Sequence, residues 1–134
     1  MSPAYQRSAI LIIEEDAATL ADVHQTLTGA GYCCRGCSDL ATAAECVRIA
    51  QPELILSSAR IAGVEGLAAC QMLQEQERLP EVPLMFLSSS QGPDVIRRAH
   101  AGAGIYYLRK PLDAAVLLEL VDRSLSKAPL APAG

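Results

Sequence analysis

Six polar residues that follow short apolar runs could together form one chemical site. They are Glu14, Glu15, Ser57, Ser58, Ser88 and Lys110. Their carboxylates, hydroxyls and ammonium group offer charge and hydrogen bonds, but a serine hydroxyl attacks an electrophile only with help from a general base. Neither histidine, His24 or His100, stands at a strand end where it could serve these serines. The sequence therefore predicts a polar site without a catalytic residue.

Two of these serines close a short apolar strand. Residues 54–56, Leu-Ile-Leu, are too few for a helix and are typical of a central parallel strand that is covered on both faces. Ser57 and Ser58 would leave that strand at its carboxyl end, which is the edge where open α/β sheets gather ligands and chemistry. Gly63 and Gly66 then permit a turn before the next helix.

The remaining polar residues need other strands that end at the same edge. Apolar runs predict strands over residues 9–13, 32–37, 84–87 and 105–108 as well, and amphipathic segments predict helices over about 17–30, 39–50, 65–77, 93–101 and 113–125. Asp16, Asp39 and Asp113 are suitable N-caps for three of these helices, with Ser38 as an alternative for the second. Strands that alternate with helices predict an α/β fold, a five-stranded doubly wound parallel sheet of the flavodoxin-like type.

Length and composition limit the domain organisation and the partners. The chain of 134 residues suffices for one domain, and we expect a lead-in over residues 1–7, the domain over residues 8–126 and a Pro/Ala-rich tail or linker over residues 127–134. A net charge of −4 without a basic run argues against nucleic acid as a partner of this domain. No apolar run approaches the length of about 20 residues that a membrane helix needs. Residues 10–13 are also too few for a signal peptide core, so we expect a cytoplasmic protein.

The sequence contains five cysteines, at positions 33, 34, 37, 46 and 70. An odd number in a domain with an adequate aliphatic core does not indicate a disulfide framework. Cys33, Cys34 and Cys37 lie close together in sequence, but no second pair at metal-ligand spacing and no nearby histidine accompanies them. We interpret the cysteines as small hydrophobic residues, and keep a redox or metal sensor built on these three as an alternative.

The polar residues also stand at informative intervals along the chain. Glu15 and Ser58 are 43 residues apart, Ser58 and Ser88 are 30 apart, and Ser88 and Lys110 are 22 apart. This order, an acid pair, a position at the end of a central strand, a hydroxyl and a lysine followed by proline, resembles the site of the response-regulator receiver domains of two-component signalling. The stretch of residues 52–66 also resembles the acceptor strand and loop of that family.

The resemblance covers about residues 8–126 and implies roles for the matching positions. In that family the acid pair holds Mg²⁺, and an aspartate on the third strand accepts a phosphoryl group from a phosphohistidine of a partner kinase. A hydroxyl and a lysine contact the resulting acyl phosphate, and an aromatic residue turns inward in the active state. The matching residues here are Glu14 and Glu15 for the acids, Ser88 for the hydroxyl, Lys110 for the lysine and Tyr107 for the aromatic residue.

Ser58, which falls on the acceptor position, departs from the family pattern. A carboxylate is ionised and nucleophilic at neutral pH, whereas a serine hydroxyl is not, so we expect no aspartyl phosphate here. The lost carboxylate and the longer Glu side chains predict Mg²⁺ binding at Glu15 that is weak or absent, and no other cofactor. Lys110 could then pair directly with Glu14 or Glu15, which predicts a fixed site rather than a switch.

The resemblance implies a signalling module rather than an enzyme. We expect it to dock on a protein partner or on a second copy through helix 93–101, strand 105–108 and helix 113–125. An alternative is a switch in which another kinase phosphorylates Ser57 or Ser58. A flavodoxin-type cofactor binder shares the fold class, but the acids after strand 9–13 would repel a phosphate group.

Overall fold

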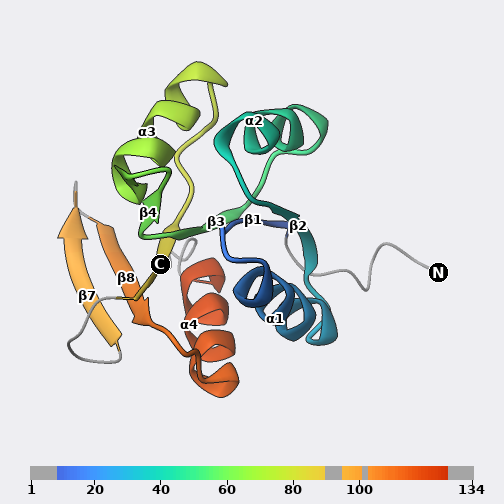
Figure 1. The fold of residues 1–134 in the computed structure, drawn as a ribbon, viewed down its shortest axis with the longest axis vertical. Coiled ribbons are helices and arrows are strands. Elements are labelled where there is room, and N and C mark those ends of the chain that lie inside the picture. The colour runs from blue at the N-terminus through green and yellow to red at the C-terminus, as the bar shows by residue number, and fades with distance from the viewer. Residues whose placement is uncertain (1–8, 90–94, 101–102, 127–134) are drawn as a thin grey trace, which may run out of the picture.

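The structure, a computed structural model, describes residues 9–89, 95–100 and 103–126 of the chain. These residues form a six-stranded sheet in the order β2-β1-β3-β6-β8-β7, together with a separate pair of short strands (Figure 1). The mutually parallel strands are β1 (Ala9–Ile13), β2 (Cys33–Cys37), β3 (Leu54–Ser58), β6 (Leu84–Ser88) and β8 (Ala103–Arg109). The predicted five-stranded parallel sheet is therefore confirmed, in the strand order of flavodoxin-like folds.

Each helix of the described residues begins where the sequence predicts a start. The helices are α1 (Ala17–Gly29), α2 (Leu40–Ile49), α3 (Gly66–Gln76) and α4 (Ala114–Ser126). Asp16 accepts a hydrogen bond from the backbone N–H of Thr19 at 2.9 Å, and Asp39 accepts one from Thr42 at 2.7 Å. Asp113 accepts from the N–H of Ala115 at 2.9 Å. These carboxylates satisfy backbone donors that a helix leaves free at its first turn.

Two apolar layers hold the sheet. Helices α1 and α4 cover one face and α2 and α3 cover the other (Figure 1). Successive residues of β3 point to opposite faces, so that Leu56 packs with α1 and α4 whereas Ile55 packs with α2 and α3. Because both faces are covered, the central strands are apolar until their carboxyl ends, where β3 and β6 finish in serine. No helix in the described parts of the chain has the length and hydropathy to cross a membrane.

The helix predicted over residues 93–101 is wrong where the structure describes it. Residues Val95–His100 form β7, a strand that pairs antiparallel with β8 in the register Val95 with Leu108 and His100 with Ala103. The first positions and the last position of the predicted helix lie outside the described residues. So short a helix is marginal by itself, Val95 and Ile96 favour strands, and β7 satisfies backbone groups along an edge that β8 would otherwise expose. The predicted docking face consequently contains β7, β8 and α4, with a strand in place of the expected helix.

A second difference lies between β3 and α3, where the sequence predicted only a turn. Strands β4 (Arg60–Ile61) and β5 (Val64–Glu65) form a two-stranded antiparallel hairpin there. Its turn residues have positive φ angles, 50° at Ala62 and 79° at Gly63, as a two-residue hairpin turn requires. A glycine after a small residue, with β-branched Ile61 and Val64 on either side, is the signal in the sequence that could have predicted this hairpin.

Candidate functional site

A pocket of about 380 Å³ opens at the carboxyl edge of the sheet, and we call it the rim pocket. Strands β1, β3, β6 and β8 all end at this edge because they run parallel. The pocket is lined by Glu14, Glu15, Asp16, Ser58, Ala59, Arg60, Leu87, Ser88, Ser89 and Lys110. The structure thus brings together five of the residues that the sequence analysis selected, and adds Asp16 and Arg60 to them.

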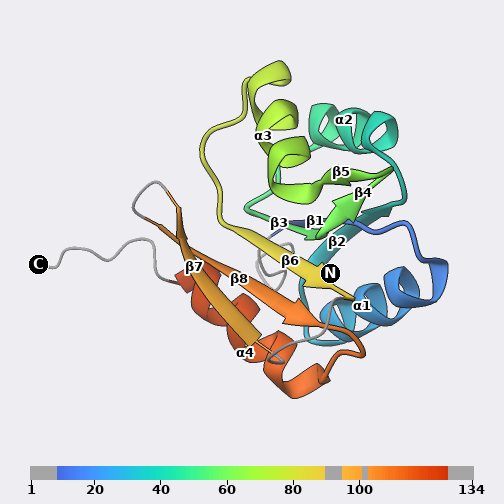
Figure 2. The same ribbon diagram turned by 60° about the vertical axis from the view of Figure 1, so that its left-hand side comes forward.

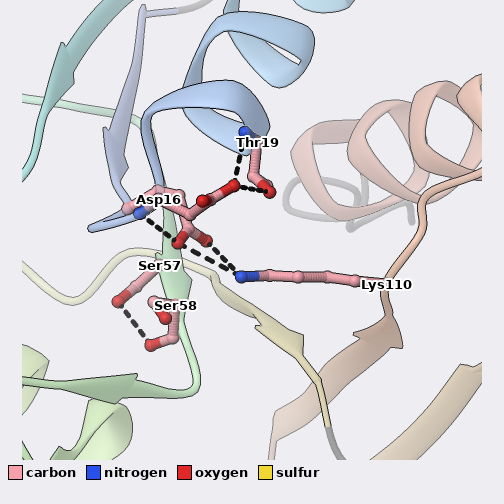
Figure 3. Close-up of polar contacts among 6 residues, drawn as sticks. Asp16, Thr19, Ser57, Ser58 and Lys110 are labelled. Atoms are coloured by element: carbon pink, nitrogen blue, oxygen red, sulfur yellow. Dashed lines mark hydrogen bonds and ion pairs between the residues drawn. The ribbon is translucent and has the colours of Figure 1, made fainter.

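Glu14 and Lys110 form an ion pair at the base of the rim pocket. The Lys110 Nζ lies 3.1 Å from Oε1 of Glu14 and donates a hydrogen bond to Oε2 at 3.2 Å, reaching from the segment before α4 to the end of β1 (Figure 3). The backbone N–H of Asp16 donates to the same Oε2 at 2.9 Å. Glu14 is only 1% exposed, so its charge depends on these partners rather than on water. Of the two acids that the sequence offered to Lys110, the structure selects Glu14.

Glu15 points its carboxylate to a different segment. Its Oε2 accepts a hydrogen bond from the backbone N–H of Ala62, at the tip of the β4–β5 hairpin. Sequence reasoning missed this contact because the two residues are separated by 47 positions and Ala62 contributes only its backbone. The adjacent acids therefore bind two loops that border the rim pocket.

The two serines at the end of β3 differ in access. Ser57 is fully buried, and its Oγ donates to the backbone oxygen of Ser58 at 2.9 Å. Ser58 follows Ser57 at the end of the strand (Figure 3). It is 8% exposed and lines the rim pocket. The resemblance matches Ser58 to the acceptor position, and the side chain of Ser58 offers a hydroxyl to the rim pocket.

Ser88 and Tyr107 lie on neighbouring strands. Ser88 ends β6, and its backbone oxygen accepts a hydrogen bond from the N–H of Lys110 at 2.8 Å, which fixes the start of the segment that carries the lysine. The ring of half-buried Tyr107 stacks on Phe86, with 5.2 Å between the ring centroids. Tyr107, which the resemblance matches to the aromatic position, is not among the residues that line the rim pocket.

Both histidines lie on elements away from Ser58. The His24 Nδ1 lies 3.4 Å from the Thr28 hydroxyl, and the ring borders a separate groove between α1 and Gly36 of β2. His100 pairs with Ala103, at the end of β8 opposite to Lys110.

The residues at this edge do not fit the divalent cation that the receiver resemblance implies. Mg²⁺ prefers several anionic oxygens in a near-octahedral arrangement. Glu14 is neutralised by Lys110, one oxygen of Glu15 accepts from Ala62, and Ser58 offers a neutral oxygen. In the described residues, no group of three or more His, Cys, Asp or Glu side chains is arranged to hold a metal ion.

The cysteines of β2 differ in access along the strand. Cys33 is exposed, Cys34 is half-buried and Cys37 is buried. Burial raises the pKa of the Cys37 thiol to about 12, and burial raises that of Cys70 on α3 to about 11. Both thiols are therefore protonated at neutral pH, and the thiolate is the reactive form.

We expect native-state alkylation to follow this order. At pH 8, iodoacetamide should modify Cys33 within minutes, whereas Cys37 and Cys70 should react only after unfolding in guanidinium chloride, because they are both buried and protonated. Peptide mass spectrometry of samples quenched over time measures this directly. Rapid native modification of Cys37 would support the thiol-sensor alternative.

Comparison with known proteins places the chain in a family. Residues 10–122 match the family model of the response regulator receiver domain. The chain is 27% identical over 121 residues to the DNA-binding transcriptional regulator NtrC of Escherichia coli, an alignment that covers 90% of this chain and 25% of NtrC. It is 32% identical over 124 residues to the DNA-binding dual master transcriptional regulator RpaA of Synechocystis, covering 92% of this chain and 51% of RpaA. The chain thus spans about a quarter to a half of the length of these relatives.

Solved structures support the same fold. A putative response regulator from Chloroflexus aurantiacus matches with a TM-score of 0.73 at 20% identity, covering 91% of this chain and all of the other. The chemotaxis protein CheY4 of Vibrio cholerae matches with a TM-score of 0.72 at 21% identity, covering 88% of this chain and 98% of that protein. The family match, the strand order and the residues gathered at the carboxyl edge agree with one another. The chain belongs to the response regulator receiver domain family, the signalling modules of two-component systems.

Proposed function

We propose that this receiver domain works without an aspartyl phosphate and transmits its signal by docking on a protein. The observation that carries this proposal is the residue at the end of β3. Ser58 lines the rim pocket where the family has its acceptor carboxylate, and neither histidine lies near it. The three carboxylates that line the pocket, Glu14, Glu15 and Asp16, contact Lys110, Ala62 and Thr19 respectively, and a hydroxyl without an available base does not attack phosphorus at a useful rate. The phosphoryl transfer that switches the family therefore has no nucleophile here.

The ion pair of Glu14 and Lys110 supports the same proposal. In the family resemblance this lysine contacts the acyl phosphate, but here it is already bound to a buried carboxylate. A ligand that recruited Lys110 would leave the charge of Glu14 unpaired, which is costly in a buried site. We therefore propose that the site is held in one state, and that the outer surface, which includes α4, β8 and β7, meets the partner.

Phosphorylation of Ser57 or Ser58 by another kinase has less support. A protein kinase binds an extended segment around its target hydroxyl, whereas Ser57 is fully buried inside β3 and Ser58 is 8% exposed. Access would require β3, the central strand, to leave the sheet. The structure gives this alternative no favourable observation.

Labelling with a small phosphoryl donor tests the proposal. We expect the wild type and a Ser58→Ala variant to incorporate no phosphate from acetyl phosphate with Mg²⁺, while a receiver domain with the acceptor aspartate is labelled in parallel. Intact-protein mass spectrometry measures the incorporation. Labelling of the wild type that is lost in Ser58→Ala would overturn the proposal.

A Ser58→Asp variant separates two causes of inactivity. Because both acids are already engaged by Lys110 and Ala62, we expect this variant to remain unlabelled as well. Labelling of Ser58→Asp alone would mean that the acids can still rearrange around a metal. In that case the claim of a site held in one state would be wrong, although the missing nucleophile would still explain the wild type.

A further inference from the structure

The β4–β5 hairpin is a small structure between β3 and α3. It stands apart from the main sheet and lies against α3 (Figure 2). Two residues in each strand give it few hydrogen bonds of its own, and an isolated two-stranded hairpin is marginal in water. Its position must therefore depend on contacts with the rest of the domain.

The base and the tip of this hairpin are held by different contacts. At the base, the Gly66 N–H donates to the Ala59 oxygen at 2.7 Å. Next to the turn, Ile61 pairs with Val64, and the Ile61 side chain is buried with the residues of α2 and α3. At the tip, the Arg60 guanidinium donates to the Gly63 oxygen, a contact within the hairpin itself. The bond from the Ala62 N–H to Glu15 links the tip to the loop after β1.

We propose that Glu15 is the positioning residue of the β4–β5 hairpin, and that its carboxylate holds the hairpin tip beside the rim pocket. This inference goes beyond the proposed function because it concerns a backbone segment in the unmodified domain. A hydrogen bond to an ionised acceptor is stronger than one between neutral groups. The hairpin turn requires the positive φ of 50° at Ala62, and the bond to Glu15 supports this non-glycine residue in a region that it rarely adopts.

The consequence concerns the shape of the rim pocket. Arg60 of the hairpin and Glu15 both line that pocket, so a hairpin held at its tip gives the pocket a fixed wall. Without the carboxylate, the tip would keep its internal contacts and the neighbouring buried side chain of Ile61, but the Ala62 N–H would lose its acceptor. Glu15 thus has a structural task at the position that the family resemblance assigns to a metal ligand.

Amide hydrogen exchange measured by NMR tests this inference. We expect Glu15→Ala to speed the exchange of the Ala62 amide about tenfold, because it removes the acceptor. Glu15→Gln keeps an acceptor oxygen and should restore most of the protection. Replacing the charged acceptor should also move the Ala62 amide proton resonance upfield in both variants, which a general loss of stability would not do.

Glu53→Ala is the matched control. The Glu53 carboxylate likewise accepts a distant backbone N–H, that of Ala9 at 3.0 Å, but at the opposite edge of the sheet. We expect this variant to leave the exchange of residues 62–64 unchanged. The inference is overturned if Glu15→Ala leaves the Ala62 amide as protected as in the wild type, or if Glu53→Ala speeds it equally. Neither result bears on phosphate labelling, so this inference and the proposed function fail separately.

Discussion

Replacing Lys110 with methionine is expected to lower the free energy of unfolding by about 3 kcal/mol. Methionine retains most of the apolar stem but removes the ammonium group that lies 3.1 Å from Glu14. The side chain of Glu14 is 2% exposed and that of Lys110 is 22% exposed, so the carboxylate cannot turn to water when its partner is lost. Most of the lost free energy of unfolding comes from the unpaired charge of the buried Glu14 carboxylate, and less from the attraction within the pair.

The two partners should therefore respond unequally to substitution. Glu14→Gln leaves Lys110 able to reach solvent, and the side-chain oxygen of the glutamine can still accept a hydrogen bond from the Asp16 N–H. We therefore expect the free energy of unfolding to fall by only about 1 kcal/mol. The double variant Lys110→Met/Glu14→Gln has no unpaired charge and should be more stable than Lys110→Met alone. Urea unfolding of the four proteins completes a double-mutant cycle. Equal losses for the two single variants, with no recovery in the double variant, would contradict this account of the ion pair.

A Gly66→Ala substitution is expected to lower the free energy of unfolding by about 3 kcal/mol. A Cβ atom at this position would lie 2.3 Å from the backbone oxygen of Ser58 and 3.1 Å from that of Ala59. These are backbone atoms at the end of the central strand, so they cannot move aside as the end of a flexible side chain could. The start of α3 would have to shift away from β3, and the Gly66 N–H bond to Ala59 would be lost with it.

Gly29→Ala is the control for this substitution. A Cβ at Gly29, the last residue of α1, meets nothing within 4 Å, and alanine in a helix is favoured over glycine by up to about 1 kcal/mol. We therefore expect Gly29→Ala to be neutral or stabilising in the same urea titration. A Gly66→Ala domain as stable as the wild type would show that α3 does not need its close approach to β3.

The sequence was sufficient where local signals and the fold agree. The apolar runs of β1 and β3, and the capping aspartates Asp16 and Asp39, are each determined by a few neighbouring residues. The position of the acids, the serines and Lys110 just after apolar runs was sufficient to predict that they meet at one edge, because the carboxyl ends of parallel strands share that edge.

The sequence was not sufficient where a distant partner decides the outcome. Residues 95–100 carry a weak helical pattern, and pairing with β8 turns them into a strand. The choice of Glu14 by Lys110 and of Ala62 by Glu15 depends on side-chain geometry across loops that are far apart in sequence. The spacing of residues along the chain does not determine which of these contacts form.

An NMR titration of the unmodified domain, first with Mg²⁺ and then with beryllium fluoride, tests the central claim most directly. The informative amides are those of Glu15, Ser58, Ser88, Tyr107 and Lys110. A site that lacks the acceptor carboxylate, with both acids already engaged, should show no saturable shifts at these positions. Saturable shifts at Ser58 and Lys110 would mean that the site still binds a metal or a phosphoryl analogue, and that it is a switch after all.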